Sequence, residues 1–190
     1  MATRARWEHT WRERPVEEAN NLNPAFCGEL IFRTMSEYRG VRKAPLSFPL
    51  SFLVLPIALH KPTRDQLPGN ASAAFAGWAA EHATFLVDFP DRVARLAPVT
   101  REALLLLLQH RVIRVEDGDL TAGAKPIRAS ALPEQTTDDA DDARRAAALL
   151  GRWFARQRQP SLVMQALGVA PRAFNCAASR STRTTANGAM

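Results

Sequence analysis

The sequence predicts a mainly α-helical fold that carries one small β-hairpin. Apolar residues recur every three or four positions in several segments, which is typical of helices that turn one face to a core. Residues 48–59 are apolar nearly all round, so we expect a helix at the centre of that core. An Asp-Gly pair at 117–118 follows a short alternating segment, which is typical of a tight hairpin.

The chain is expected to form one helical domain over residues 16–171. Residues 1–15 are polar and irregular, which predicts a flexible arm, and residues 172–190 are small and polar, which predicts a disordered tail. A helix that leads directly into a hairpin has the outline of a winged helix. We therefore place a winged-helix-like unit at about residues 98–127.

The first helices are expected to begin and end at capping residues. Asn23 followed by Pro24 predicts the start of the first helix, and Gly40 predicts its end. A further amphipathic helix is expected at residues 72–87, with a short continuation from 89 to 96.

Pro98 predicts a break, after which Thr100 would cap a new helix. That helix contains five consecutive leucines at 104–108, which we expect to be buried on all sides. The acidic run at 138–142 predicts the start of a long helix that ends in arginines, because these charges complement the helix dipole. A short last helix is expected at 161–167.

The composition excludes several classes of protein. The net charge of +6 invites a nucleic-acid interpretation, but much of the excess lies near the two ends and favours solvated surface. The two cysteines are far apart, which argues against a disulfide framework or a zinc site, and Cys27 lies on an apolar helix face as an inert core thiol. No segment is long and apolar enough to span a membrane, and no secretory signal is visible, so we expect a cytoplasmic protein.

Catalytic motifs are missing from the sequence. It has no Walker A loop, no G-x-G-x-x-G and no G-x-S-x-G, and its four histidines are scattered without a second ligand at metal spacing. We therefore expect no enzymatic activity, no cofactor and no metal.

The string HKPTRD at 60–65 is briefly similar to a phospholipase D signature. That signature needs one residue between its histidine and its lysine, whereas His60 and Lys61 are adjacent. We interpret the string instead as a helix terminus. There, Pro62 prevents continuation, and His60 and Lys61 offset the free carbonyls.

Four segments, in this order, carry a resemblance to a known family. They are EEANNLNPAFCGELI (17–31), FLVLPIALHKPTRDQLP (52–68), LAPVTREALLLLLQHRVI (96–113) and GRWFARQRQPSLVMQALGVAPR (151–172). Together they resemble the middle component of bacterial three-component ABC systems, which is encoded beside an SMC-like ABC ATPase and a third component. The resemblance implies a non-enzymatic adaptor that couples the ATPase to an effector protein in defence against phages or plasmids.

The resemblance transfers no residue roles, so the interaction surface is proposed from the distinctive strings alone. Its candidate residues are Asn20, Asn23, His60, Lys61, Thr63, Arg64 and Arg101. With an adaptor, any contact with DNA would be indirect.

Two alternatives stay open. A DNA-binding winged helix could contact phosphates through Arg111, Arg114 and Arg128, although its leucine-rich helix is poor material for reading base edges. An unrecognised enzyme would need a polar pocket that gathers His60, Arg64 and Arg101.

Overall fold

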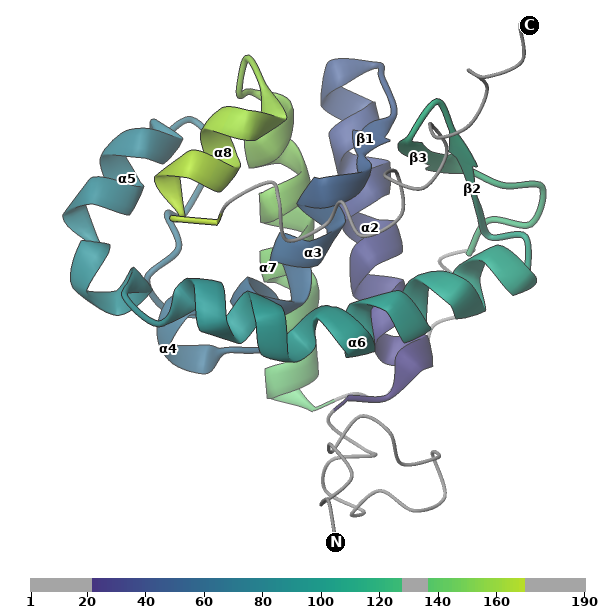
Figure 1. Cartoon of the computed structure of the whole chain (residues 1–190), viewed down its shortest axis with the longest axis horizontal. Helices are drawn as coiled ribbons and strands as arrows, with labels where there is room; N and C mark the ends of the chain where they lie inside the picture. The colour runs from purple at the N-terminus through teal and green to yellow at the C-terminus, as the bar shows by residue number, and fades with distance from the viewer. Residues whose placement is uncertain (1–21, 128–136, 170–190) are drawn as a thin grey trace, which may run out of the picture.

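The computed structural model describes residues 22–127 and 137–169 and confirms a mainly helical fold with a small antiparallel sheet (Figure 1). The elements follow in the order α2 (Pro24–Arg42), β1 (Leu46–Ser47), α3 (Phe48–Ala58), α4 (Lys61–Arg64), α5 (Phe75–Glu81), the 3-10 helix η3 (Ala83–Leu86), α6 (Phe89–Gln109), β2 (Ile113–Glu116), β3 (Asp119–Ala122), α7 (Asp138–Ala155) and α8 (Pro160–Ala166). The predicted arm at 1–15 and tail at 172–190 lie outside the described residues, and the division into domains stays a prediction.

Helix α3 is the centre of the core, as its composition predicts. Every residue from Leu50 to Ala58 is buried, and the helix contacts α2, α6 and α7. In Figure 1, α6 runs across α2, while α5 and α8 lie on one side of the molecule and the sheet on the other. The apolar surface that α3 removes from water is a large part of what holds these helices together.

Helices α2 and α7 approach each other closely, backbone against backbone. The Thr34 hydroxyl donates to the carbonyl of Ala147 at 2.9 Å. A Cβ atom on Gly151 would lie only 2.3 Å from the carbonyl oxygen of Thr34 and 2.7 Å from Cβ of Glu37. A glycine at position 151 is therefore what allows the two helices to approach this closely.

Aromatic side chains attach α5 to α7. The Phe75 ring lies 4.5 Å from the Trp153 ring, and Trp78 meets Trp153 at 5.2 Å in an edge-to-face arrangement, both measured between centroids. Both indoles are also anchored by hydrogen bonds. Trp153 Nε1 donates to the Ala73 carbonyl at 2.7 Å, and Trp78 Nε1 donates to the Gln66 carbonyl at 2.8 Å.

The hairpin forms where the Asp-Gly pair predicts it. Asp117 and Gly118 have positive φ angles of 52° and 83°, as a two-residue type I′ turn requires. Strand β3 pairs with β2 through Val115 and Leu120, and with β1 through Leu46 and Leu120. The sheet order is therefore β1-β3-β2, with a third strand that the sequence did not predict.

Two predictions about the helix at 89–109 are wrong. Pro98 does not divide it, because α6 continues from Phe89 to Gln109, and buried Thr100 donates its hydroxyl to the Leu96 carbonyl at 3.0 Å instead of capping a new helix. Burial along α6 offsets the backbone hydrogen bond that the proline removes. The leucines are not buried on all sides either, since 57% of Leu105 is exposed.

Other helix limits differ by a few residues. Asn23 caps α2 as predicted, accepting from the Ala25 amide at 2.8 Å, but the helix passes Gly40 and ends at Arg42, followed by the C-cap Lys43, whose φ is 58°. The helix predicted at 72–87 begins only at Phe75, because the Asn70 side chain accepts from the Ser72 amide at 2.9 Å and holds a turn before it. It ends at Glu81 and is followed by η3.

The last two helices begin close to where the sequence predicts. The side chain of Thr137 caps α7 by accepting from the Ala140 amide at 3.3 Å, and acidic residues fill the first turn. Helix α8 follows at Pro160. Among the residues that the structure describes, no helix has both the length and the apolar character needed to cross a bilayer.

The buried thiol of Cys27 is expected to resist alkylation and disulfide exchange. It is fully buried, and the loss of solvation raises its pKa to about 12, with a smaller contribution from the charge of Glu102. In the Cys176→Ser variant, an aromatic disulfide reagent at neutral pH should label no thiol until urea unfolds the chain. Rapid labelling of the folded variant would contradict this burial.

Candidate functional site

Two arginines from outside α3 donate hydrogen bonds to backbone carbonyl groups at its C-terminal end. Helix α3 has no basic residue in its last turn. Arg64 Nη1 donates to the Ala58 carbonyl at 2.8 Å, and Arg92 Nη1 reaches the Pro56 carbonyl at 3.4 Å. Both side chains are buried, so these interactions take place away from water. The interpretation that gave this role to His60 and Lys61 is wrong.

His60 instead begins the next helix. As the N-cap of α4, its Nδ1 accepts from the Thr63 amide at 3.3 Å and lies 2.8 Å from the Thr63 hydroxyl. Because Nδ1 accepts from the Thr63 amide, the neutral imidazole carries its proton on Nε2, and the Thr63 hydroxyl donates to Nδ1. Arg92 Nη1 donates to the same hydroxyl oxygen at 2.9 Å. Pro62 occupies the first turn of α4, a position that proline favours, and does not act as a stop. We call this group, His60, Thr63, Arg64 and Arg92, the α3 junction.

The α3 junction should make stability depend on pH. Burial lowers the pKa of His60 below its usual 6.5, and the nearby charge of Arg92 lowers it further, against a smaller opposite effect of Asp88. The unfolded chain then binds the proton more tightly than the folded one. This contribution is therefore complete above pH 6.5 and lost as the pH falls through the folded pKa.

Urea unfolding between about pH 5 and pH 8 measures this effect. The free energy of unfolding of the wild type should rise with pH across this window more steeply than that of the His60→Asn variant, which keeps a capping side chain but cannot titrate. Parallel curves for the two proteins would contradict the assignment.

Arg64 also joins the α3 junction to the start of α7. Its Nη2 forms an ion pair with Asp139, in the first turn of α7. Only 4% of the Arg64 side chain is exposed, and its Nε has no hydrogen-bond partner among the described residues. Arg64 therefore brings a desolvated charge and one unsatisfied donor to this place.

An open cleft of about 400 Å³ lies next to Arg64, between the end of α4 with the segment that follows it and one face of α7. We call it the arginine cleft. It is lined by Arg64, Asp65, Leu67, Gly69, Asp142, Arg145, Ala146, Ala148, Leu149 and Arg152. Most of the α7 residues stand three or four positions apart, which places them on one face of the helix.

Two arginines of the arginine cleft, Arg145 and Arg152, form ion pairs that are partly exposed to water. Arg145 pairs with Asp142, and Arg152 Nη1 lies 2.9 Å from Glu37 Oε2 of α2. The Arg145 side chain is 71% exposed. Exposed pairs of this kind contribute little stability, so their guanidinium groups can exchange partners with a bound ligand.

One comparison decides the family. The family description that matches is the ABC-three component (ABC-3C) system Middle Component 3, over residues 11–171. The chain belongs to this family. The match spans the α3 junction and the arginine cleft, and it confirms the resemblance seen in the sequence. No curated protein and no solved structure matched the chain.

In the structure of this middle component, three of the candidate residues predicted from sequence, His60, Thr63 and Arg64, lie in the α3 junction, and the others are not part of it. Thr63 and Arg64 are buried, whereas Lys61 is exposed and pairs with Asp65 at 3.1 Å. Arg101 lies on α6 with its guanidinium carbon 5.9 Å from the Phe52 ring centroid. The cap residue Asn23 belongs to α2, and Asn20 lies outside the described residues.

The pocket required by the enzyme alternative is not the arginine cleft. Of His60, Arg64 and Arg101, only Arg64 lines it. Within residues 22–127 and 137–169, no three His, Cys, Asp or Glu side chains are grouped so that they could hold a metal ion.

Arg145 and Arg152 were not predicted as site residues. Their signal is a spacing of seven residues, with Leu149 between them, which puts all three on one face of α7. The sequence prediction related the charges of this helix to its dipole, and a dipole effect depends on position along the helix and not on the face that a residue occupies.

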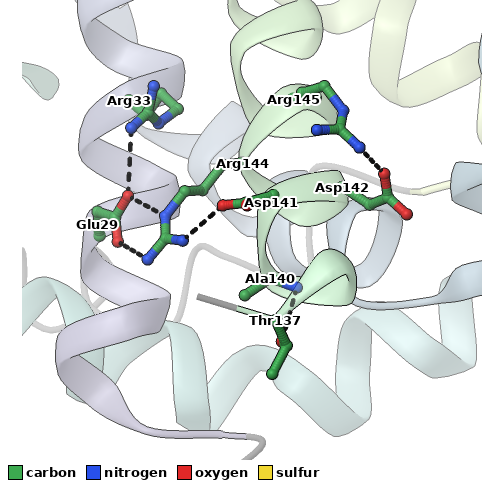
Figure 2. A network of polar contacts seen from close by, with 8 residues as sticks. All are labelled: Glu29, Arg33, Thr137, Ala140, Asp141, Asp142, Arg144 and Arg145. Atoms are coloured by element: carbon green, nitrogen blue, oxygen red, sulfur yellow. Dashed lines mark hydrogen bonds and ion pairs between the residues drawn. The ribbon is translucent and has the colours of Figure 1, made fainter. Parts of the chain in front are cut away.

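A partly buried polar network joins α7 to α2 in this middle component. Figure 2 shows Arg144 directed to α2, where its Nε and Nη2 donate to the two oxygens of Glu29 at 2.8 and 3.0 Å. Arg144 also donates to Asp141 at 3.0 Å, and these bonds, chiefly those with Glu29, raise its pKa. Its neighbour Arg145 turns away from Glu29 toward Asp142. Arg144 is thus held between α7 and α2, whereas Arg145 lines the arginine cleft.

Proposed function

We propose that this middle component is a non-enzymatic, cytoplasmic adaptor that couples an SMC-like ABC ATPase to an effector in a system that defends against phages or plasmids. The observation that carries the proposal is the family match over residues 11–171, because a middle component works with other components of its system. The adaptor role and the identity of the ATPase are the proposed parts.

The polar side chains of the α3 junction bond within the fold, and this supports the adaptor role. In the α3 junction, Arg64, Arg92, His60 and Thr63 bond to backbone groups, acidic side chains or one another, which is the work of structural residues. The most distinctive string of the sequence therefore builds the fold next to the arginine cleft. The contacts with a partner are then left to exposed groups.

Exposed apolar side chains support it further. Val87 is 80% exposed, and the nearby Phe85, whose ring lies 6.4 Å from that of His82, is half exposed. Both lie where η3 passes into α6. A partner that covers these two side chains would remove their apolar surface from water.

Size exclusion in the presence of the ABC ATPase of the same system tests the adaptor role. The two purified proteins, mixed at micromolar concentration, should elute together in size exclusion, and the ATPase alone should elute later. Separate elution of the two would contradict the proposal.

The arrangement of the small sheet favours DNA binding as a second candidate. We propose that helices α2, α3 and α6 form a winged-helix-like unit with the sheet, in which β1 joins the hairpin in the order β1-β3-β2. Arg111 and Arg114 are exposed and could contact phosphates, while Arg128 lies outside the described residues. Against this, the outer face of α6 carries exposed Leu105.

Titration of duplex DNA at low salt tests the second candidate. Binding with a steep salt dependence that weakens in the Arg114→Glu variant would support it. No binding at low salt would exclude it.

A further inference from the structure

We infer that the arginine cleft binds a segment of a partner protein in which an acidic residue stands beside an apolar one. The inference rests on the proposed adaptor role and adds to it the chemistry of the contact. It follows from three properties of the cleft: its arginines, its apolar lining and its two aspartates.

The arginines provide the anchor for a carboxylate. Arg145 and Arg152 both line the cleft, and their present partners, Asp142 and Glu37, are themselves partly exposed to water. A guanidinium group binds a carboxylate with two parallel hydrogen bonds, so an incoming acidic side chain can replace these weak pairs.

Arg64 adds a third guanidinium group to the lining of the cleft. It lines the same cleft although it is almost fully buried, and its Nε has no hydrogen-bond partner among the described residues. A buried donor without an acceptor destabilises the structure that contains it.

The remaining lining favours an apolar side chain next to the acid. It consists of the side chains of Leu67, Ala146, Ala148 and Leu149. The volume of about 400 Å³ is at the small end of the range for ligand pockets. The cleft is therefore suited to a few side chains of a protein segment, with apolar contact below and ionic contact at the rim.

The two aspartates argue against a nucleic acid. Asp65 and Asp142 stand among the arginines of the lining. A nucleic-acid strand carries a negative charge about every 3.4 Å, so its phosphates would meet these carboxylates as well as the guanidinium groups. A peptide segment can bring a single carboxylate to Arg145, in place of Asp142, without carrying a further negative charge to Asp65.

Two variants block the cleft in different ways. Arg145→Glu reverses the charge of an exposed residue, and Gly69→Trp adds a large side chain at a position where a new Cβ would meet no atom within 4 Å. Arg156→Glu is the matched control, because Arg156 is exposed at the end of the same helix and does not line the cleft. Melting temperatures close to that of the wild type verify that all three fold.

The first measurement is the affinity of the four proteins for the purified ABC ATPase. Arg145→Glu and Gly69→Trp should each weaken binding by roughly tenfold or more, whereas Arg156→Glu should stay within about twofold of the wild type. Equal binding by all four would overturn the inference for the cleft and leave the adaptor role standing.

The second measurement does not depend on the ATPase. A short fluorescent peptide of alternating glutamate and leucine should bind the wild type, and its affinity should fall as salt is added. Its affinity for Arg145→Glu and for Gly69→Trp should be much lower. A lysine–leucine peptide should not bind. Equal affinity for the two peptides, or duplex DNA that binds in an Arg145-dependent way, would overturn the inference. Peptide binding without ATPase binding would instead reject the adaptor role as proposed and keep the cleft.

Discussion

Replacing Gly151 with alanine is expected to lower the free energy of unfolding by about 3 kcal/mol. The new Cβ would stand 2.3 Å from the Thr34 carbonyl oxygen and 2.7 Å from Cβ of Glu37. Neither is the end of a flexible side chain, so α2 and α7 must move apart along the interface that Thr34 and Ala147 seal with a hydrogen bond. Alanine favours a helix over glycine by only about 1 kcal/mol, which is less than this steric cost.

The matched control is Gly40→Ala, in the interior of α2. A Cβ at Gly40 would meet no atom within 4 Å, so only the gain in helix propensity remains. We expect this variant to be more stable than the wild type by about 0.5–1 kcal/mol. Urea unfolding followed by circular dichroism measures both. If Gly151→Ala raised the free energy of unfolding as Gly40→Ala does, this result would contradict the close approach of α2 and α7 at Gly151.

Local signals predicted the fold where the decisive contacts are local. Asn23 and Pro24 start α2 because capping and a fixed φ act within one turn. The hairpin forms at Asp117 and Gly118 because the turn needs two positive φ angles. Pro98 misled the prediction because burial along α6, which depends on the whole fold, outweighs the loss of one backbone hydrogen bond.

The site depends on contacts that no local pattern shows. Arg92 reaches the Pro56 carbonyl from 36 positions away, and Arg64 pairs with Asp139 from 75 positions away. The sequence placed cations at the end of α3 but named the wrong ones, since His60 and Lys61 are nearest only along the chain. Of the arginine cleft, Arg64 alone was among the predicted site residues.

The adjacent residues Arg144 and Arg145 should respond very differently to substitution by methionine. Arg144→Met should cost about 3 kcal/mol, because it leaves Glu29, whose side chain is only 10% exposed, without its two closest donors. Among the described residues, Arg33 at 3.3 Å would still pair with it. Arg145→Met should cost at most about 0.5 kcal/mol, since this side chain and its pair with Asp142 are exposed.

A double-mutant cycle separates the ion pair from the packing around it. Glu29→Leu alone should also destabilise the protein, since it leaves the largely buried Arg144 with Asp141 as its ionic partner. In the double variant neither charge is left without its partner, so most of the loss should be recovered. Additive losses would mean that Arg144 acts through packing, such as its contact with the Phe26 ring, 5.4 Å from the guanidinium carbon. Recovery would establish charge pairing as what fixes α7 against α2, and with it the direction in which Arg145 faces.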